Sequence, residues 1–214
     1  VCPLSRQPGE WERACVDIGR GEGKSLGSPL ASGCPYYGIL WSKKVHARQI
    51  PGRMVGRTVD MEGKPGFVLT MQAREQHIRR DKATSNICSN QALNALAASV
   101  AMTALGKVGT QEMAYQNIVK TRYAKEAFEK AGFDVVFGGA HFNEIVVDYK
   151  KSIKEVNAHL FTQGILGGYD LGLTYPSLAN HALIAVTEQR TKEEIDALVQ
   201  HTAACVQEME AANA

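Results

Sequence analysis

The sequence predicts an α/β protein, and three observations support this class. Apolar residues recur at helical spacing between residues 86 and 132. Short apolar runs at 133–137, 144–148 and 182–186 favour strands. Two capping boxes follow the second and third of these runs and place helices there. Strands that alternate with helices in this way are typical of the α/β class.

The first part of the chain is expected to hold short strands and little helix. Residues 14–18 and 38–42 are predicted as buried strands on either side of a glycine-rich stretch. Residues 43–66 contain six Lys or Arg, two prolines and four glycines, so we expect an irregular, exposed segment. Residues 67–72 form a further candidate strand. Because no helix precedes the glycines between Gly19 and Gly38, the chain is expected to continue from a missing N-terminal part.

Two helices are expected next. The first starts at Asn86, with Thr84 or Ser85 as its N-cap, and Gly106 should end it. The second covers residues 110–132 and is expected to connect two parts of the chain, residues 1–109 and 110–214.

The two capping boxes start the last two predicted helices. They are Ser152-x-x-Glu155 and Thr191-x-x-Glu194. In each, the first side chain accepts a hydrogen bond from the backbone of the glutamate, whose carboxylate accepts one in return. Both boxes are expected to form.

Composition describes an ordinary globular protein with an uneven charge distribution. Of 214 residues, 44% are hydrophobic and 21% charged, with a formal net charge of +2. Counting Lys, Arg, Asp and Glu gives zero for residues 1–42, +6 for 43–82 and −4 for 83–214. No apolar run of membrane-spanning length and no signal pattern is evident, so no membrane association is expected.

The five scattered cysteines lack C-x-x-C spacing and are odd in number. They predict reduced thiols in a cytoplasmic protein, without a disulfide framework or a metal site. The six histidines likewise contain no pair at metal-binding helical spacing.

The most informative segment is a cationic run that ends in hydroxyl and amide side chains. The candidate site residues are His77, Arg79, Arg80, Lys82, Thr84, Ser85 and Asn86. Cationic side chains beside a helix N-terminus bind anions, most often phosphate. The sequence therefore predicts a phosphate site here, although Thr84 or Ser85 capping its own helix is the alternative, and both can hold together.

Lys24 lies in a glycine-rich turn after a predicted strand, where many enzymes hold pyridoxal phosphate as a Schiff base. A solvated turn lysine is the simpler interpretation. A Walker A motif is rejected, because only three residues separate Gly19 from Gly23. The G-x-S-x-G pattern of residues 23–27 is rejected as a nucleophile elbow, because Pro29 disfavours the helix that must follow.

The basic stretch of residues 43–82 has two further interpretations. Clustered Arg and Lys can bind nucleic-acid phosphates, but interleaved aromatic residues for base stacking are absent. The same residues can meet carboxylates of another subunit at an interface. We favour an interface and a phosphate site, and expect no nucleic acid.

Three segments, residues 51–60, 69–80 and 82–88, closely resemble the glycine dehydrogenase (decarboxylating) subunit 1 family. Its members are the alpha subunits of the bacterial two-subunit P-protein of the glycine cleavage system. They are about twice as long as this chain, which resembles their C-terminal half. The resemblance implies fold type I of the pyridoxal-phosphate-dependent transferases. Residues 1–109 would be the C-terminal portion of the large α/β domain, and 110–214 a linking helix and the small C-terminal α/β domain.

The resemblance also implies an activity in amino-acid catabolism. Glycine is decarboxylated with pyridoxal phosphate, and its aminomethyl group passes to the lipoylated H-protein. The coenzyme lysine belongs to the partner, subunit 2, in an α2β2 heterotetramer. This chain would complete the partner's active site, with Thr84, Ser85 and Asn86 at the coenzyme phosphate and Arg79, Arg80 and His77 nearby.

Lys24 departs from the family, whose alpha subunits usually carry glutamine there. Lys24, Pro29 and Pro35 reproduce the lysine–proline spacing of subunit 2, but Gly23 replaces the histidine that precedes the coenzyme lysine. A self-sufficient enzyme that uses Lys24, and a basic interaction module, are the alternatives.

Overall fold

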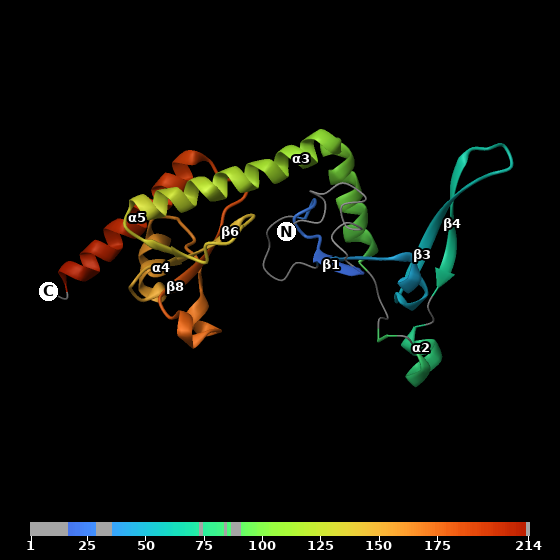
Figure 1. Ribbon diagram of the computed structural model, residues 1–214, viewed down its shortest axis with the longest axis horizontal. Coiled ribbons are helices and arrows are strands. Elements are labelled where there is room, and N and C mark those ends of the chain that lie inside the picture. Colours follow the sequence, from blue (N-terminus) through green and yellow to red (C-terminus); the bar gives the residue numbers. More distant parts are fainter. Residues whose placement is uncertain (1–16, 29–35, 73–74, 84, 87–90, 213–214) are drawn as a thin grey trace. The chain divides into compact units, whose positions relative to one another are not determined.

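The computed structural model describes residues 17–28, 36–72, 75–83, 85–86 and 91–212 (Figure 1). It divides into two compact units, Arg6–Gly106 and Lys107–Ala214. The helix α3 (Ala92–Lys130) carries the chain from one unit to the other, and Gly106 interrupts its helical geometry with φ 63° and ψ −175°. We describe each unit by itself.

The N-terminal unit starts with an antiparallel pair, β1 (Ile18–Glu22) and β2 (Gly38–Ser42). Glycines in and directly after β1 leave room for aromatic rings in and directly before β2. A Cβ on Gly19 would lie 1.9 Å from the Trp41 ring, and one on Gly23 would lie 2.2 Å from the Tyr37 ring. Each ring thus covers bare backbone of the neighbouring strand. The predicted strand 38–42 is confirmed in position, but its residues are exposed or half-buried rather than buried. Of the predicted strand 14–18, residues 14–16 lie outside the described part of the chain, and β1 begins at Ile18.

A β-hairpin follows, formed by β3 (Arg53–Val59) and β4 (Pro65–Gln72). The prediction of an irregular segment over 43–66 is therefore wrong in part, since η2 (Lys44–Gln49) and β3 are both regular. The hairpin turn is held by Asp60, whose carboxylate accepts hydrogen bonds from the backbone N–H groups of Glu62 and Lys64 at 2.9 and 2.8 Å. The Asp60 side chain thus accepts hydrogen bonds from backbone N–H groups in the turn, as aspartates in turns commonly do.

The predicted helix start at Thr84 or Ser85 is wrong. The helix α3 begins at Ala92, and Gln91 accepts the hydrogen bond of Ala95 N–H at 2.9 Å. The run Asn86-Ile-Cys-Ser-Asn has weak helix propensity, because its short polar side chains compete for backbone groups. Thr84 itself lies outside the described residues. The predicted stop at Gly106 appears as a kink within α3, since Lys107 resumes helical geometry at once.

The C-terminal unit contains an antiparallel sheet in the order β5-β6-β8-β7. Its strands are β5 (Asp134–Val136), β6 (Glu144–Asp148), β7 (Tyr169–Asp170) and β8 (His181–Ala185). The predicted strands 133–137, 144–148 and 182–186 are thus confirmed, with shifts of one residue at the ends of the first and third. All strand pairs that the structure describes are antiparallel, and the mostly parallel sheet of the large domain is not among them.

One face of this sheet packs on helices. The helices are the second part of α3, α4 (Ile153–Thr162) and α5 (Lys192–Ala211) (Figure 1). Alternate strand residues are buried, with Ile145 and Val147 on β6 and Ala182 and Ile184 on β8. Period-two burial of this kind gives a sheet with one core face.

The rings of Phe128, Phe133 and Tyr149 pack together at the centre of this core, with centroids 5.7 to 6.3 Å apart. Phe128 and Tyr149 are completely buried. Burial raises the pKa of the Tyr149 hydroxyl well above its usual range, so this group stays neutral. Aromatic clusters of this size dominate the packing energy of a small core.

Only one of the two capping boxes forms. Thr191 Oγ1 accepts from Glu194 N–H at 3.2 Å, and Glu194 Oε2 accepts from Thr191 N–H at 2.8 Å. Ser152 is the N-cap of α4, but its side chain makes no cap hydrogen bond. Thr191 has extended backbone (φ −84°, ψ 166°), whereas Ser152 has φ −56° and ψ 117°. The backbone conformation at the N-cap thus determines whether the side chain can accept a hydrogen bond from the backbone N–H three residues later.

The helix α3 is long and apolar enough, by length and composition, to cross a membrane. Its best window has a mean hydropathy of 1.3 and is 6% buried. The expectation that no segment has these properties is therefore wrong, although one such helix is weak evidence for a membrane span. The apolar residues exposed on α3 include Leu93, Leu96 and Val100.

Candidate functional site

The cationic segment forms a short helical stretch in the N-terminal unit. It consists of α2 (Gln76–Arg79) and η3 (Arg80–Lys82). The backbone N–H groups of Ile78 and Arg79 both donate to Glu75 O at 3.0 Å, and Ala83 N–H donates to Arg80 O at 3.2 Å. Arg80 has a positive φ of 55°, which turns the chain between the two helical pieces.

The cations of this segment are available for a ligand. Arg79, Arg80 and Lys82 are exposed, and none of them makes an ion pair within the described residues. His77 differs, because its Nδ1 lies 3.4 Å from Glu75 Oε2. The carboxylate thus orients the imidazole, and the three remaining cations are free to meet an anion.

The hydroxyl and amide residues lie outside a helix N-terminus. Ser85 is half-buried and Asn86 is exposed, six or more residues before α3 begins. The N-terminal N–H groups of α3 are therefore not part of the predicted site, which retains the side chains of Ser85 and Asn86. Thr84 cannot be placed, since it lies outside the described residues. An anion at this segment would rest on guanidinium, ammonium, hydroxyl and amide groups.

Lys24 lies in a separate part of the same unit. It follows β1 in a turn where Leu26 N–H donates to Gly23 O at 2.9 Å and the Leu26 side chain is buried. Its ammonium lies 5.4 Å from the centre of the Tyr36 ring. Glu22 Oε1 accepts from Lys24 N–H at 2.8 Å. These contacts fix the turn, and the cation–π contact is a favourable position for an ammonium without any coenzyme.

The turn at Lys24 also packs on α3. Gly27 has φ 79°, and a Cβ there would lie 2.7 Å from Ala101 Cβ and 2.9 Å from Ala97 O. Only glycine fits both the positive φ and this close approach. The turn at Lys24 thus packs on α3 through Gly27.

Two other cations of residues 43–82, Lys43 and Lys64, make ion pairs. Lys43 Nζ lies 2.8 Å from Asp17 Oδ1, and this contact holds the pKa of Asp17 below its usual value. Lys64 pairs with Glu62 at the hairpin turn. Arg53 and Arg57, on β3, are exposed and make no ion pair in the described part of the chain. The positive charge that remains uncompensated in the described residues therefore lies on η2, on the hairpin and on the segment after it.

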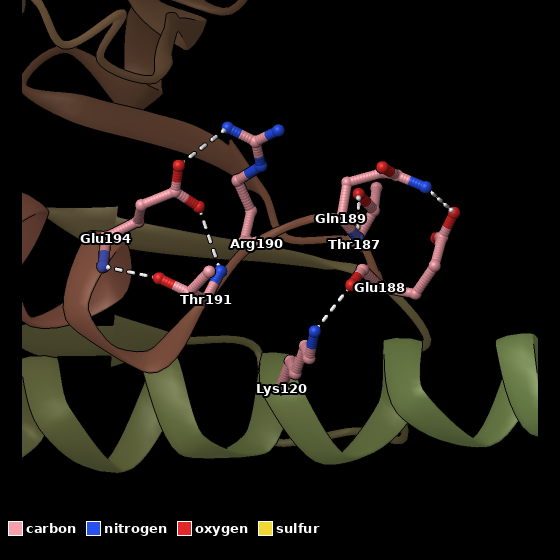
Figure 2. A network of polar contacts seen from close by, with 7 residues as sticks. All are labelled: Lys120, Thr187, Glu188, Gln189, Arg190, Thr191 and Glu194. Carbon is pink, nitrogen blue, oxygen red and sulfur yellow. Dashed lines mark hydrogen bonds and ion pairs between the residues drawn. The ribbon is translucent and has the colours of Figure 1, made fainter.

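A polar network in the C-terminal unit was not predicted from the sequence (Figure 2). Lys120 on α3 donates to Glu188 O at 2.5 Å, and Asn117 Oδ1 accepts from Glu188 N–H at 3.0 Å. Thr121, completely buried, donates to Val186 O at 3.1 Å. These bonds fasten α3 to the loop between β8 and α5, which the Thr191 capping box continues. The sequence signal was the spacing of the polar residues Asn117, Lys120 and Thr121 at i, i+3 and i+4 of a predicted helix, which does not identify their partner.

A second unpredicted group surrounds a cavity of about 240 Å³ between α3 and α5. Asp196 accepts from the Tyr123 hydroxyl at 2.5 Å and pairs with Lys192 Nζ at 2.6 Å. The Lys192 hydrogen bond holds the pKa of Asp196 below its usual range, and Asp196 raises the pKa of Lys192. Each group in this set has a partner in the same set, so the set is structural.

Metal ligands do not converge in the described part of the chain. No group of three His, Cys, Asp or Glu side chains there could hold a metal ion. Cys205 is buried, and burial raises the pKa of its thiol, so it packs as a small apolar residue.

Comparison with known proteins agrees with this architecture. The family model of the glycine cleavage system P-protein matches residues 3–202. Probable glycine dehydrogenase (decarboxylating) subunit 1 of Lysinibacillus sphaericus (strain C3-41) is 65% identical over 184 residues. The same-named protein of Bacillus cytotoxicus is 64% identical over the same length. Each match covers 86% of this chain and 41% of the relative, so the chain spans about two fifths of the length of these relatives.

Solved structures give the same result. A crystal structure of glycine decarboxylase (P-protein) of the glycine cleavage system, in inhibitor-bound form, matches with a TM-score of 0.80 and 35% identity. That match covers 95% of this chain and 46% of the other. A NifS-like protein matches with a TM-score of 0.54 at 12% identity and supports the fold alone. The predicted fold, type I of the pyridoxal-phosphate-dependent transferases, is therefore confirmed, and the chain belongs to the glycine cleavage system P-protein family.

Proposed function

We propose that this chain is part of subunit 1 of a glycine decarboxylase and completes the active site of subunit 2. The enzyme would decarboxylate glycine with pyridoxal phosphate and transfer the aminomethyl group to lipoylated H-protein. The family membership supports the reaction, since relatives 63–65% identical carry the name glycine dehydrogenase (decarboxylating) subunit 1. The assembly would be a cytoplasmic α2β2 heterotetramer.

The observation that carries the proposal is the set of unpaired cations in residues 79–82. Three exposed cations without ion pairs in the described residues are unfavourable in isolation, because like charges repel. A phosphate accepts several charge-assisted hydrogen bonds from such groups. Thr84, Ser85 and Asn86 follow within a few residues and would add hydroxyl and amide donors. We assign this segment to the coenzyme phosphate of the partner subunit, with His77 nearby.

Pyridoxal phosphate, when bound, supplies an electron sink for the carbanion left by decarboxylation. The role of this chain is restricted to binding and orientation. Arg79, Arg80 and Lys82 would neutralise the phosphate, while Ser85 and Thr84 would fix its rotation. Glu75 would keep the His77 imidazole in one orientation. No proton transfer is assigned to these residues.

The experiment uses the assembled enzyme, with subunit 2 present. The double substitutions Thr84→Val with Ser85→Ala, and Arg79→Gln with Arg80→Gln, should each weaken pyridoxal-phosphate binding about tenfold or more, because charge-assisted hydrogen bonds are lost. Coenzyme affinity is measured from the visible absorbance on titration. Lys44→Gln, an exposed cation on η2, is the control and should leave affinity unchanged. Unchanged affinity in both double variants would refute the assignment.

The isolated chain tests Lys24 as a coenzyme lysine. Its contact with Tyr36 needs no coenzyme, and Gly23 offers no ring to stack on a pyridine. We expect no Schiff-base absorbance from the chain alone after incubation with pyridoxal phosphate. An absorbance that Lys24→Ala abolishes would reassign the chemistry to this subunit.

A further inference from the structure

Arg80, within the segment assigned to the coenzyme phosphate, has a strained backbone. Its φ of 55° and ψ of −126° lie in a region that L side chains rarely occupy. In turns this conformation is typical of glycine at the first central position. A non-glycine residue held there costs stability, and it persists only where surrounding interactions compensate the strain. Arg80 therefore requires a compensating interaction.

Two of the three other non-glycine residues with positive φ in the described part of the chain show what such compensation consists of. Lys150 (φ 57°) follows β6, where its N–H donates to Asp148 Oδ1 at 2.7 Å and its Nζ lies 3.0 Å from Asp134 Oδ2. Asn180 (φ 68°) precedes β8, and its carbonyl accepts from the N–H of the completely buried Tyr149 at 2.9 Å. Both residues are thus held by polar contacts with the sheet of the C-terminal unit and the chain next to it.

Arg80 has no support of this kind within the described residues. Its backbone hydrogen bonds are local, since its N–H donates to Gln76 O and its O accepts from Ala83 N–H at 3.2 Å. No side chain of α2 or η3 is buried, and residues 76–82 are all exposed. Packing within the described part of the chain therefore does not compensate the strain.

The charge of the same turn indicates which group compensates it. Arg79, Arg80 and Lys82 carry three positive charges and Asp81 carries one negative charge, which leaves +2. None of these four side chains makes an ion pair within the described residues. A phosphate monoester carries about −1.5 to −2 charges at pH 7 and accepts several charge-assisted hydrogen bonds. A carboxylate of a neighbouring polypeptide carries one negative charge and would leave the turn positive. A phosphate monoester is therefore the better match.

We infer that the turn at Arg80 is coupled to phosphate binding: a phosphate monoester compensates its strain, so that coenzyme binding stabilises residues 76–83 in the strained conformation. This inference rests on the proposed function, which identifies the phosphate as that of pyridoxal phosphate. A ligand shifts an equilibrium between two conformations only if it binds one of them more tightly. Here the strained turn binds phosphate, and a relaxed turn with negative φ at Arg80 does not. The relaxed population therefore lowers the apparent affinity for the coenzyme.

The first test measures hydrogen–deuterium exchange in the assembled enzyme, with subunit 2 present. Pyridoxal phosphate should slow the exchange of residues 76–83 about fivefold or more, which is the lower end of what such an outlier costs. The hairpin turn of residues 60–64 is the matched control, because it is equally exposed and its N–H groups are held by Asp60. Its exchange should change less than about twofold.

The second test compares two substitutions of Arg80 in the same assembled enzyme. Arg80→Gly and Arg80→Gln both remove the guanidinium, so both should bind pyridoxal phosphate more weakly than the unsubstituted enzyme. Glycine adopts φ 55° without strain, whereas glutamine does not. The Kd of Arg80→Gln should therefore be about fivefold higher or more than that of Arg80→Gly, as measured by visible absorbance on titration.

Arg79 supplies the matched pair of controls. It neighbours Arg80, is also exposed, and has an ordinary backbone with φ −98° and ψ −7°. Glycine relieves no strain there and lowers helix propensity. The Kd of Arg79→Gly should therefore equal or exceed that of Arg79→Gln, which is the reverse of the order expected at Arg80.

The inference and the proposed function fail separately. If all four variants bind the coenzyme more weakly but Arg80→Gly and Arg80→Gln do so equally, the phosphate assignment stands and the coupling to strain is refuted. If coenzyme leaves the exchange of residues 76–83 unchanged, other polypeptide contacts hold the turn, and the inference is overturned. If all four variants bind like the unsubstituted enzyme, the phosphate assignment of these arginines is refuted together with the inference.

Discussion

The two units of the chain differ in how they bury apolar residues. Every member of the hydrophobic core cluster belongs to Lys107–Ala214, and the sheet there is covered by three helices. In the described part of Arg6–Gly106 the buried apolar side chains are Leu26 and Ala98, although it contains two hairpins and the first part of α3. The C-terminal unit is a closed core, whereas the N-terminal unit is a set of elements with open apolar surfaces.

This difference indicates which surfaces of the chain require contacts with further polypeptide. The chain spans about 41% of the length of its curated relatives. A unit with its own core depends less on the remaining length, because its sheet and helices already bury one another's apolar side chains. The open unit depends on additional contacts, and its exposed apolar residues record where those contacts would lie. The unpaired cations of residues 79–82 are in the same unit.

The largest expected effect follows from this contrast. Phe128→Ala removes a completely buried ring that contacts Phe133 and Tyr149, so the C-terminal unit should lose about 3–5 kcal/mol of unfolding free energy. Phe67→Ala removes an exposed ring of the hairpin and should change the free chain by less than about 0.5 kcal/mol. Urea denaturation of the two variants measures both. Equal losses would mean that the hairpin is covered within the free chain, and the comparison would fail.

The sequence predicted the closed unit better than the open one. The strand at 144–148 and the Thr191 capping box were predicted at their observed positions. Their signals are local, since apolar runs and cap residues act within a few positions. The β3 strand was missed, because its Arg, Gly and Val residues lack a buried face within this chain. Strand formation there depends on cross-strand partners, which composition does not reveal.

The candidate phosphate site stays a prediction, and the structure shows only where its described residues lie. The cations of residues 79–82 are exposed, as an anion site requires, but Ser85 and Asn86 are not at a helix N-terminus. A run of short polar side chains both suggests a cap and opposes a helix, so the start of α3 could not be decided from the sequence. The polar network of Asn117 and Thr121 depends on a loop about 65 residues away, and no local pattern encodes that distance.

The next effect concerns the junction of the two units. Gly106→Ala places a Cβ at φ 63° and ψ −175°, a region that only glycine occupies readily, so about 1–3 kcal/mol should be lost. Gly138→Ala is the control, because its Cβ would meet nothing within 4 Å and its φ is outside the left-handed range. Urea denaturation followed by circular dichroism compares the two. A stabilised Gly106→Ala variant would indicate that α3 prefers to be continuous, and the separation into two units would lose its structural basis.

The smallest expected effect concerns the N-caps of α5 and α4, which contribute local rather than packing stability to the C-terminal unit. Thr191→Ala removes the side-chain bond of a formed capping box, which Thr191 Oγ1 accepts from Glu194 N–H, and should cost about 1 kcal/mol in urea denaturation, several times less than Phe128→Ala. Ser152→Ala should cost less than about 0.5 kcal/mol, because Ser152 makes no side-chain cap bond although its sequence pattern is the same. The two substitutions distinguish the effect of the capping-box sequence from that of the hydrogen bonds formed, since both Ser152 and Thr191 have a glutamate three residues later. Equal costs would mean that Ser152 caps α4 in solution, and that the sequence is the better guide to both helix starts.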